Sequence, residues 1–252
     1  ESSMNRTTGA LLAGLAVVLA SADASAIELG TPATAHPYRS PQNFAFELRF
    51  SPYRPQVDEE PGLQGKPFED TFGPNPRLSL QLEFDWQVLR IPHLGTIGPG
   101  LGVGLVSFGR DVQTVSGRES GDETNFTVYP FWLSGVLRAD VFWREYGFPF
   151  VPYGKLGAGM GIWRASGATG TSRDDAGVAG KGTTFGTHTA LGVAFALDVI
   201  DDGASKNMDE LAGINNTYVY AEYYWLSLNG LAQDNALRVG TNTWAAGLAF
   251  EF

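Results

Sequence analysis

One segment of the chain alternates strictly between apolar and polar side chains, and this period-two pattern restricts the fold more than any other feature. From Leu78 to Val88 every even-numbered residue is apolar and every odd-numbered residue is polar. A helix would scatter these apolar side chains around its circumference, whereas a strand places all of them on one face. The segment is therefore predicted to be a strand with one apolar and one polar face.

Similar alternation returns along the chain and predicts an all-β protein. About eight such segments occur, and a tilted strand that crosses a membrane needs ~9–11 residues. Together they predict an antiparallel up-and-down transmembrane β-barrel of about eight strands, with a short periplasmic helix. Besides 78–88, the predicted strands are residues 44–50, 100–108, 131–142, 153–163, 185–198, 218–225 and 244–252.

The connections between these strands alternate in length. Two of the three links after even-numbered strands are short, at 90–94 and 144–147. Transmembrane barrels combine short periplasmic turns with long outer loops, and a soluble sandwich has no reason to sort its loops in this way. The connections after odd-numbered strands are long and polar or rich in small residues, at 53–75, 110–124, 166–182 and 227–240.

Two segments depart from the simplest pattern. Residues 199–215 follow an even-numbered strand but predict a small helix, with Ser205 as N-cap and Gly213 just past its end. We expect this helix to cap the inner end of the barrel, and a plug or a docking point for a partner is the alternative. In the fourth strand, Phe126, Val128 and Trp132 fall on the parity opposite to Leu133 and Leu137. A bulge or a strand end near Pro130, which cannot donate to the ladder, would explain this.

The first residues have the features of a secretory signal peptide. Arg6 precedes an apolar run from Ala10 to Ala20, and small residues lead to Ala24-x-Ala26, after which cleavage is expected. The run is too short for the ~30 Å hydrocarbon core of a membrane, so an N-terminal anchor is the less favoured alternative. The expected organisation is a signal peptide at 1–26 (1–3 being an artefact ahead of the start Met4), a periplasmic segment at 27–42 and an outer-membrane barrel at 43–252.

Composition excludes several classes of protein. The chain has no cysteine, which excludes disulfide frameworks and cysteine-based zinc sites. Its net charge of −10 argues against nucleic acid as a partner, because a phosphate backbone is bound by clustered Lys and Arg. No segment approaches the roughly 18 apolar residues of a membrane helix, and 32 glycines with 16 phenylalanines favour sheet over a helix bundle.

Alternation alone also fits a soluble lipocalin-like carrier, whose apolar face surrounds a ligand. Three features favour lipid on the outside instead. The last strand ends on Phe250 and Phe252, both on its apolar face, which resembles the terminal aromatic signal for barrel assembly. Glycine and alanine dominate the polar faces and leave space for inward Tyr and Trp side chains, namely Tyr218, Tyr220, Tyr224 and Trp163. Aromatic residues gather next to the short turns and the C-terminus and predict a girdle at one interface, formed with Phe250 and Phe252 by Trp86, Phe142, Trp143, Tyr146 and Phe148.

The signal peptide, the eight predicted strands and Phe252 resemble the small OmpA/OmpX-type barrels. The stretches 128–140 and 151–157 also resemble a group of outer-membrane barrels of the myxobacterial type. The resemblance covers the whole mature chain and implies a location in the cell outer membrane. It also implies contact with outer-membrane lipid and lipopolysaccharide, contact with the barrel-assembly machinery during biogenesis, and a monomer. It implies little about activity, because its motifs are patterns rather than a fingerprint.

Ionisable residues occupy the face predicted to line the lumen. Such charges are expensive inside an eight-stranded barrel unless they are paired, because the interior is only wide enough to be filled with side chains. We predict a structural salt-bridge network at mid-barrel, and a gate or narrow pore lined by the same groups is the alternative. In this network we expect Arg138 and Lys155 to form ion pairs with Glu83, Asp85 and Glu222. The other ionisable residues expected to face inward are Glu47, Arg49, Asp140, Asp198 and Glu251.

Catalytic and metal-binding residues are scarce. Of the histidines at 36, 93 and 188, only His188 lies near an outer strand end, and the sequence identifies no partner for it as a general base. The acidic runs 58–60 and 174–175 lack the spaced oxygens of a calcium loop, so we interpret them as solvated loop tips. The glycine-rich segments 98–102 and 157–161 lead into no helix, which voids the similarity to nucleotide loops.

The sequence thus predicts a non-enzymatic outer-membrane barrel with a filled lumen and no cofactor, catalytic residue or metal. Its expected role is membrane integrity or surface interaction through long acidic outer loops, whose partner the sequence does not identify. Three alternatives remain open at this point: a narrow passive channel, an outer-membrane enzyme that modifies lipid A or cleaves protein, and the soluble periplasmic carrier.

Overall fold

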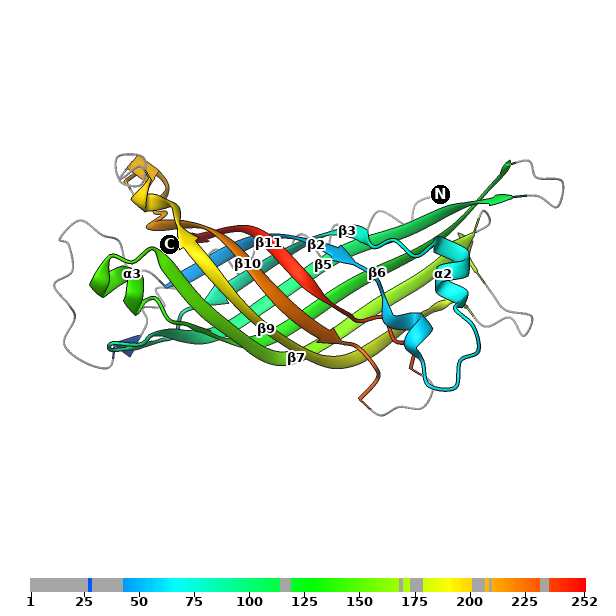
Figure 1. Ribbon diagram of the computed structural model, residues 1–252, viewed down its shortest axis with the longest axis horizontal. Helices are drawn as coiled ribbons and strands as arrows, with labels where there is room; N and C mark the ends of the chain where they lie inside the picture. Colours follow the sequence, from blue (N-terminus) through cyan, green and yellow to red (C-terminus); the bar gives the residue numbers. More distant parts are fainter. Residues whose placement is uncertain are drawn as a thin grey trace, which may run out of the picture.

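The computed structural model describes residues 27–28, 43–113, 119–167, 170–172, 179–200, 207–208, 210–231 and 236–252, without the side chains of 27–28, 111–113 and 119–123. The predicted signal peptide at 1–26 and nearly all of the segment 27–42 lie outside these residues. Figure 1 shows an elongated barrel of tilted strands with small helices at both ends.

Strands that are neighbours in sequence are also neighbours in the barrel. Within the described part of the chain, eight long strands each pair antiparallel with the next, and the last pairs with the first. The prediction of a closed up-and-down barrel of about eight strands is therefore confirmed. The long strands are β2 (Phe44–Tyr53), β3 (Arg77–Trp86), β5 (Gly95–Gln113), β6 (Glu119–Arg138), β7 (Phe150–Gly167), β9 (Lys181–Ala196), β10 (Asn216–Ser227) and β11 (Thr241–Glu251).

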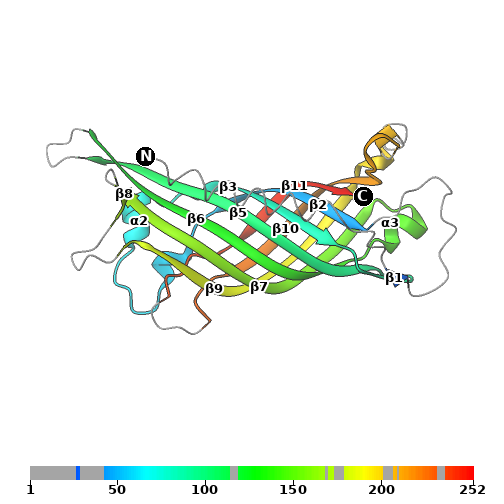
Figure 2. The ribbon, with the colours of Figure 1, turned by 180° about the vertical axis from the view of Figure 1, so that it is seen from behind.

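The two ends of the barrel differ. The helices α2 (Pro67–Phe72) and η1 (Gln56–Glu59) lie at one end, which we call the loop end. The helix α3 (Val141–Tyr146) and the C-terminus lie at the opposite end, which we call the turn end (Figures 1 and 2). Short elements extend the sheet edges, namely β1 (Ile27–Glu28), β4 (Leu89–Ile91) and β8 (Gly170–Thr171), and η2 (Leu197–Val199) follows β9.

Burial alternates along the strands, as the period-two pattern requires. On β3 the inward side chains Ser79, Gln81, Glu83 and Asp85 are buried, while Leu78 and Leu80 are exposed on the outer wall. Tyr218, Tyr220 and Tyr224 of β10 also point into the lumen and are buried, as expected.

The fourth barrel strand, β6, corrects one expectation. Its register with β7 is continuous from Asn125↔Ser166 to Arg138↔Tyr153, so no bulge lies at Pro130. Phe126, Val128 and Trp132 are buried inside the lumen, and Leu133 is exposed outside. The parity never changes along this strand. The lumen itself becomes apolar towards the loop end, so the assumption of a polar inner face fails there.

The predicted loop 110–124 is also mostly strand. β5 continues to Gln113 and β6 begins at Glu119, with Arg110 paired to Thr124 and Asp111 to Glu123. In this part of the sequence polar residues occupy both odd and even positions, so it shows none of the alternation by which strands were recognised.

The turn end contains a helix where a strand end was predicted. β6 ends at Arg138 rather than at 142, and α3 begins at Val141. Gly147 ends this helix at φ 67°, and its N–H donates to the Trp143 carbonyl at 3.1 Å. In the predicted helix of 199–215, residues 207–208 and 210–212 are helical and Gly213 has φ 68°, while Ser205 lies outside the described residues.

Inward glycines make room for aromatic rings. A Cβ on Gly102 would lie 1.9 Å from Cε2 of Trp132, and one on Gly182 would lie 2.7 Å from Cζ2 of Trp163. Each of these rings therefore occupies the space that a side chain at the glycine of the neighbouring strand would need.

We expect Gly102→Ala to destabilise the barrel by about 1–3 kcal/mol, because the new methyl group overlaps the Trp132 ring. The measurement is urea unfolding of the reconstituted barrel, followed by tryptophan fluorescence. Gly135→Ala is the matched control, since its Cβ meets no atom closer than 3.8 Å. Equal free energies of unfolding for the two variants would contradict this packing.

Candidate functional site

The lumen holds the chemically distinctive residues, and they lie in three layers. An apolar layer closes the loop end, a charged layer fills the middle, and a tyrosine-rich layer lies towards the turn end. The apolar layer contains Val106, Phe108, Phe126, Val128, Leu226 and Leu228, and the tyrosine-rich layer contains Tyr153, Tyr218 and Tyr220 with Val151, Ala194 and Ala249.

Lys155 is the centre of the charged layer. It extends from β7 across the lumen, and its Nζ lies 2.7 Å from Oε2 of Glu47 and 2.9 Å from Oε2 of Glu83. The two carboxylates lie directly opposite each other on β2 and β3, a placement that is repulsive without a cation between them. Lys155 therefore ties one wall of the barrel to the other through two fully buried ion pairs.

Two arginines complete the network. Arg138 of β6 donates to Oδ2 of Asp85 at 2.6 Å and to Glu47. Arg49 of β2 donates to Oε2 of Glu83 at 2.5 Å and to Glu222 of β10. Its guanidinium also lies over the Trp132 ring, 4.8 Å from the ring centroid.

The network nearly balances its own charge. Three cations meet four carboxylates, and all seven side chains are at most 3% exposed in these pairs. All five residues predicted for the network lie in it: Glu83, Asp85, Arg138, Lys155 and Glu222. Glu47 and Arg49 were expected to face inward, but the sequence did not assign them to the network, because their partners come from strands 34 to 173 residues away.

On the turn-end side of the network, Glu251 binds several side chains at the tyrosine-rich layer. Its carboxylate accepts hydrogen bonds from Gln87 Nε2 at 2.9 Å, from Asn216 Nδ2 at 3.1 Å and from the Tyr218 hydroxyl at 2.9 Å. Asn216 and Tyr218 belong to β10, and Gln87 directly follows β3. A single acidic side chain of the last barrel strand, β11, therefore binds both β10 and the segment after β3.

Asp140 lies beyond the end of β6 at the turn end. Its carboxylate forms ion pairs with Arg90 at 3.5 Å and with Arg144 at 3.3 Å. Burial, followed by repulsion from Glu251, raises the pKa of Asp140 to about 7. Asp198, which was also expected to face inward, instead lies in η2 and accepts a hydrogen bond from the Thr217 N–H at 3.3 Å.

A small lid covers the loop end. Phe68 of α2 is buried, and its ring packs edge-on against Phe108 with centroids 5.1 Å apart. Asp58 holds the first turn of α2 by accepting the N–H of Phe68 at 2.8 Å and of Glu69 at 3.0 Å. Arg110 donates to the Thr71 carbonyl at 2.7 Å near the other end of the helix. Asp58 is thus a helix cap, not the solvated loop tip that the sequence suggested.

His188 has a partner that the sequence did not identify. Its Nδ1 lies 2.7 Å from the Ser134 hydroxyl, which reaches it from β6 because both residues lie opposite Gly157 of β7. Both side chains are at most 2% exposed, and the ring packs against Trp132. A serine and histidine sealed between two filled layers have no access to a substrate, so the contact is structural.

The predicted aromatic residues occupy different places at the turn end. Trp86, Phe142, Tyr146 and Phe148 are exposed. Trp143 is not a girdle residue, because it packs against the tyrosine-rich layer and donates to Asn216 Oδ1 at 3.3 Å. The ring of Phe252 lies 6.0 Å from that of Phe44, and its carbonyl accepts the Phe44 N–H at 2.9 Å.

The described residues contain no group of three or more acidic, histidine or cysteine side chains that could hold a metal ion. No helix in the described ranges is long and apolar enough to cross a membrane.

We expect Lys155→Met to lower the free energy of unfolding by about 3–5 kcal/mol, because it leaves Glu47 and Glu83 buried without their shared cation. Urea unfolding in detergent micelles measures the change. The control is Lys181→Met, an exposed lysine at the loop end, for which we expect a change within about 0.5 kcal/mol. A second variant, Lys155→Met with Glu47→Gln, should recover part of the loss. Equal stability of the two lysine variants would show that the network contributes nothing.

Comparison with known proteins finds a similar fold among solved structures, while no family model and no curated protein matches the chain. Ail of Yersinia pestis, solved with the heparin analogue sucrose octasulfate, is 16% identical over 84% of this chain and 97% of its own, with a TM-score of 0.42. The N-terminal β-barrel domain of Pseudomonas aeruginosa OprF is 13% identical over 84% and 98%, with a TM-score of 0.39. Neisserial surface protein A is 15% identical over 83% and 96%, with a TM-score of 0.41. The chain is thus similar to small outer-membrane eight-stranded β-barrels.

Proposed function

We propose that the protein is a non-enzymatic barrel of the bacterial outer membrane, with a lumen filled by side chains and a role in membrane integrity or surface interaction at its loop end. The observation that carries this proposal is the division of the barrel wall. The outward side is apolar all round, and the inward side holds a paired charge network.

The outer wall supports a lipid environment. Each of the eight long strands exposes at least one large apolar side chain on this side. A soluble monomer rarely exposes a contiguous apolar patch of more than a few hundred Å². Among the described side chains of the eight long strands, the outward charges are Arg164 and Lys181, two cations that lie opposite each other in the strand register near the loop end. Representative members of the apolar band are Phe50, Leu80, Leu101, Leu133, Leu156, Leu191, Tyr223 and Trp244.

The lumen supports a filled barrel rather than a channel or an inward ligand pocket. A cavity beside Asp85 and Arg138 has a volume of about 10 Å³, which is about the room of one water molecule. The charged layer fills the middle of the barrel with side chains that are at most 3% exposed, and the buried ring of Phe68 covers the loop end. This arrangement disfavours the lipocalin-like alternative, whose apolar cavity would occupy the same space.

The loop end supports a surface role only in part. Several acidic residues there are paired internally: Arg54 lies 2.8 Å from Glu69, and Arg238 lies 3.3 Å from Glu60. The hydrogen bonds from Arg54 and Lys66 lower the pKa of Glu69. These pairs stiffen the lid, so a partner would meet an ordered surface beside the long β5–β6 hairpin.

Two further parts of the proposal concern assembly and surroundings. Phe250 and Phe252, on β11 and at its end, serve as the signal for the barrel-assembly machinery. The finished monomer contacts outer-membrane lipid and lipopolysaccharide.

The filled lumen predicts the absence of steady single-channel steps in planar lipid bilayers. Phe68→Ala tests the lid separately, and we expect no steps from it either, because the charged layer still fills the barrel. Steps from the native chain would identify a narrow channel. Steps from Phe68→Ala alone would identify a lumen that is closed only by its lid, and either result would overturn the proposal.

A further inference from the structure

The seam between the first and last barrel strands is only partly paired. β11 pairs with β2 from Glu251↔Ala45 to Ala246↔Phe50. On their other sides the same strands pair further, to Thr241↔Leu226 and to Tyr53↔Arg77. Contact across the seam resumes at the loop end, where the Gln56 N–H donates to the Gly240 carbonyl at 3.0 Å. The break lies between these points.

Pro52 explains the break. Phe44 and Phe252 exchange backbone hydrogen bonds across the seam, so every second residue after Phe44 on β2 directs its N–H towards β11. Pro52 falls in this series opposite Trp244, and proline has no N–H to donate. The ladder therefore loses a hydrogen-bonded pair at that position.

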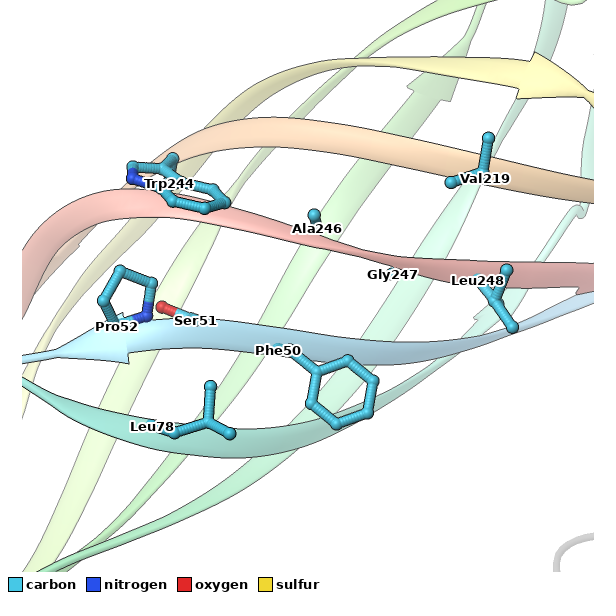
Figure 3. Close-up of a pocket in the computed structure, with 9 residues that line it drawn as sticks. All are labelled: Phe50, Ser51, Pro52, Leu78, Val219, Trp244, Ala246, Gly247 and Leu248. Atoms are coloured by element: carbon cyan, nitrogen blue, oxygen red, sulfur yellow. The ribbon is translucent and has the colours of Figure 1, made fainter.

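A groove lies on the outer wall over this break. Figure 3 shows its lining residues around the seam, with Pro52 and Leu78 on one side and Trp244 and Leu248 on the other. Its volume is about 430 Å³, and it is a shallow groove open to the surroundings rather than an enclosed cavity. The polar groups among its lining side chains are the Ser51 hydroxyl and the Trp244 indole N–H, and none of these side chains is charged. The Ser51 side chain faces the lumen, where its hydroxyl lies 2.7 Å from that of Tyr224.

We propose that this groove holds one acyl chain of a membrane lipid more tightly than the rest of the barrel surface does. The inference rests on the proposed membrane location, because the groove is continuous with the apolar band that lipid covers. That continuity identifies the occupant as an acyl chain, since the same surface offers no charge to a polar ligand. An extended chain lies along the open seam between Phe50 and Trp244 and covers backbone that the missing pair leaves without a neighbouring strand.

The test fills the groove without touching the lumen. Ala246→Phe places a ring in the groove from β11, and Ala158→Phe is the matched control on β7, at an outward position on a different part of the wall. Each full-length barrel is folded in detergent micelles with added palmitoyl-oleoyl-phosphatidylcholine. After exchange into lipid-free detergent, native mass spectrometry counts the lipid that remains bound.

We expect one lipid to remain on the native chain and on Ala158→Phe. We expect about a tenfold weaker retention on Ala246→Phe, equivalent to about 1.4 kcal/mol. Pro52→Val is a second variant that restores the N–H and closes the seam, so it should lose the lipid as well.

Equal retention by all variants, or no retained lipid on a native barrel that still inserts into vesicles, would overturn the groove alone. Failure of the native barrel to insert into vesicles at all would instead overturn the proposed function on which the groove depends.

Discussion

The pairing of buried charges in a narrow lumen is the constraint on which the rest of the structure depends. An eight-stranded barrel encloses room for side chains and little else, so each charge inside it must find a partner across the lumen. Lys155 between Glu47 and Glu83 meets this need by joining β7 to β2 and β3. Arg138 and Arg49 join β6 and β10 to the same carboxylate set. The network therefore fixes how the opposite walls face each other.

The outer wall follows from the same geometry. Because side chains alternate along a strand, placing the charges inside leaves the apolar residues outside, and the barrel then needs an apolar environment. The seam between β2 and β11 is an exception to this regular wall. Its closing pair of strands depends on backbone hydrogen bonds, and one proline on β2 is enough to interrupt them and leave an apolar groove in the wall.

The fold was predictable from sequence because alternation is a local signal. The presence of eight strands and the inward direction of the network residues follow from the parity of each strand, whereas the bounds of β5 and β6 do not, because their hairpin end does not alternate. The sequence analysis placed Arg138 and Lys155 with Glu83, Asp85 and Glu222, and the structure brings these five side chains together. The parts of Glu47 and Arg49 were not predicted, because Arg49 and Glu222, for example, meet only once register and curvature are set across 173 residues. The same holds for Ser134 and His188, whose contact needs three strands in register.

Local sequence patterns also gave wrong predictions where the role of a residue depends on its contact with another segment. The inner face near Phe126 and Val128 is apolar, and Phe68 of the lid packs against it. This contact joins segments that are far apart in the sequence, so no local pattern reveals it. Asp58 resembled an exposed acidic tip, but its role depends on the position of a helix that starts nine residues later, at Pro67. Trp143 was assigned to the girdle as part of a strand end, and α3 turns its ring towards the tyrosine-rich layer.

Migration in SDS of protein taken from purified outer membranes, boiled against unboiled, tests the central claim most directly. A closed barrel in lipid keeps its hydrogen-bonded wall in SDS until it is heated, so the two samples should migrate differently. Identical migration of the two samples, or recovery of the protein in the soluble periplasmic fraction instead of the membranes, would contradict the account.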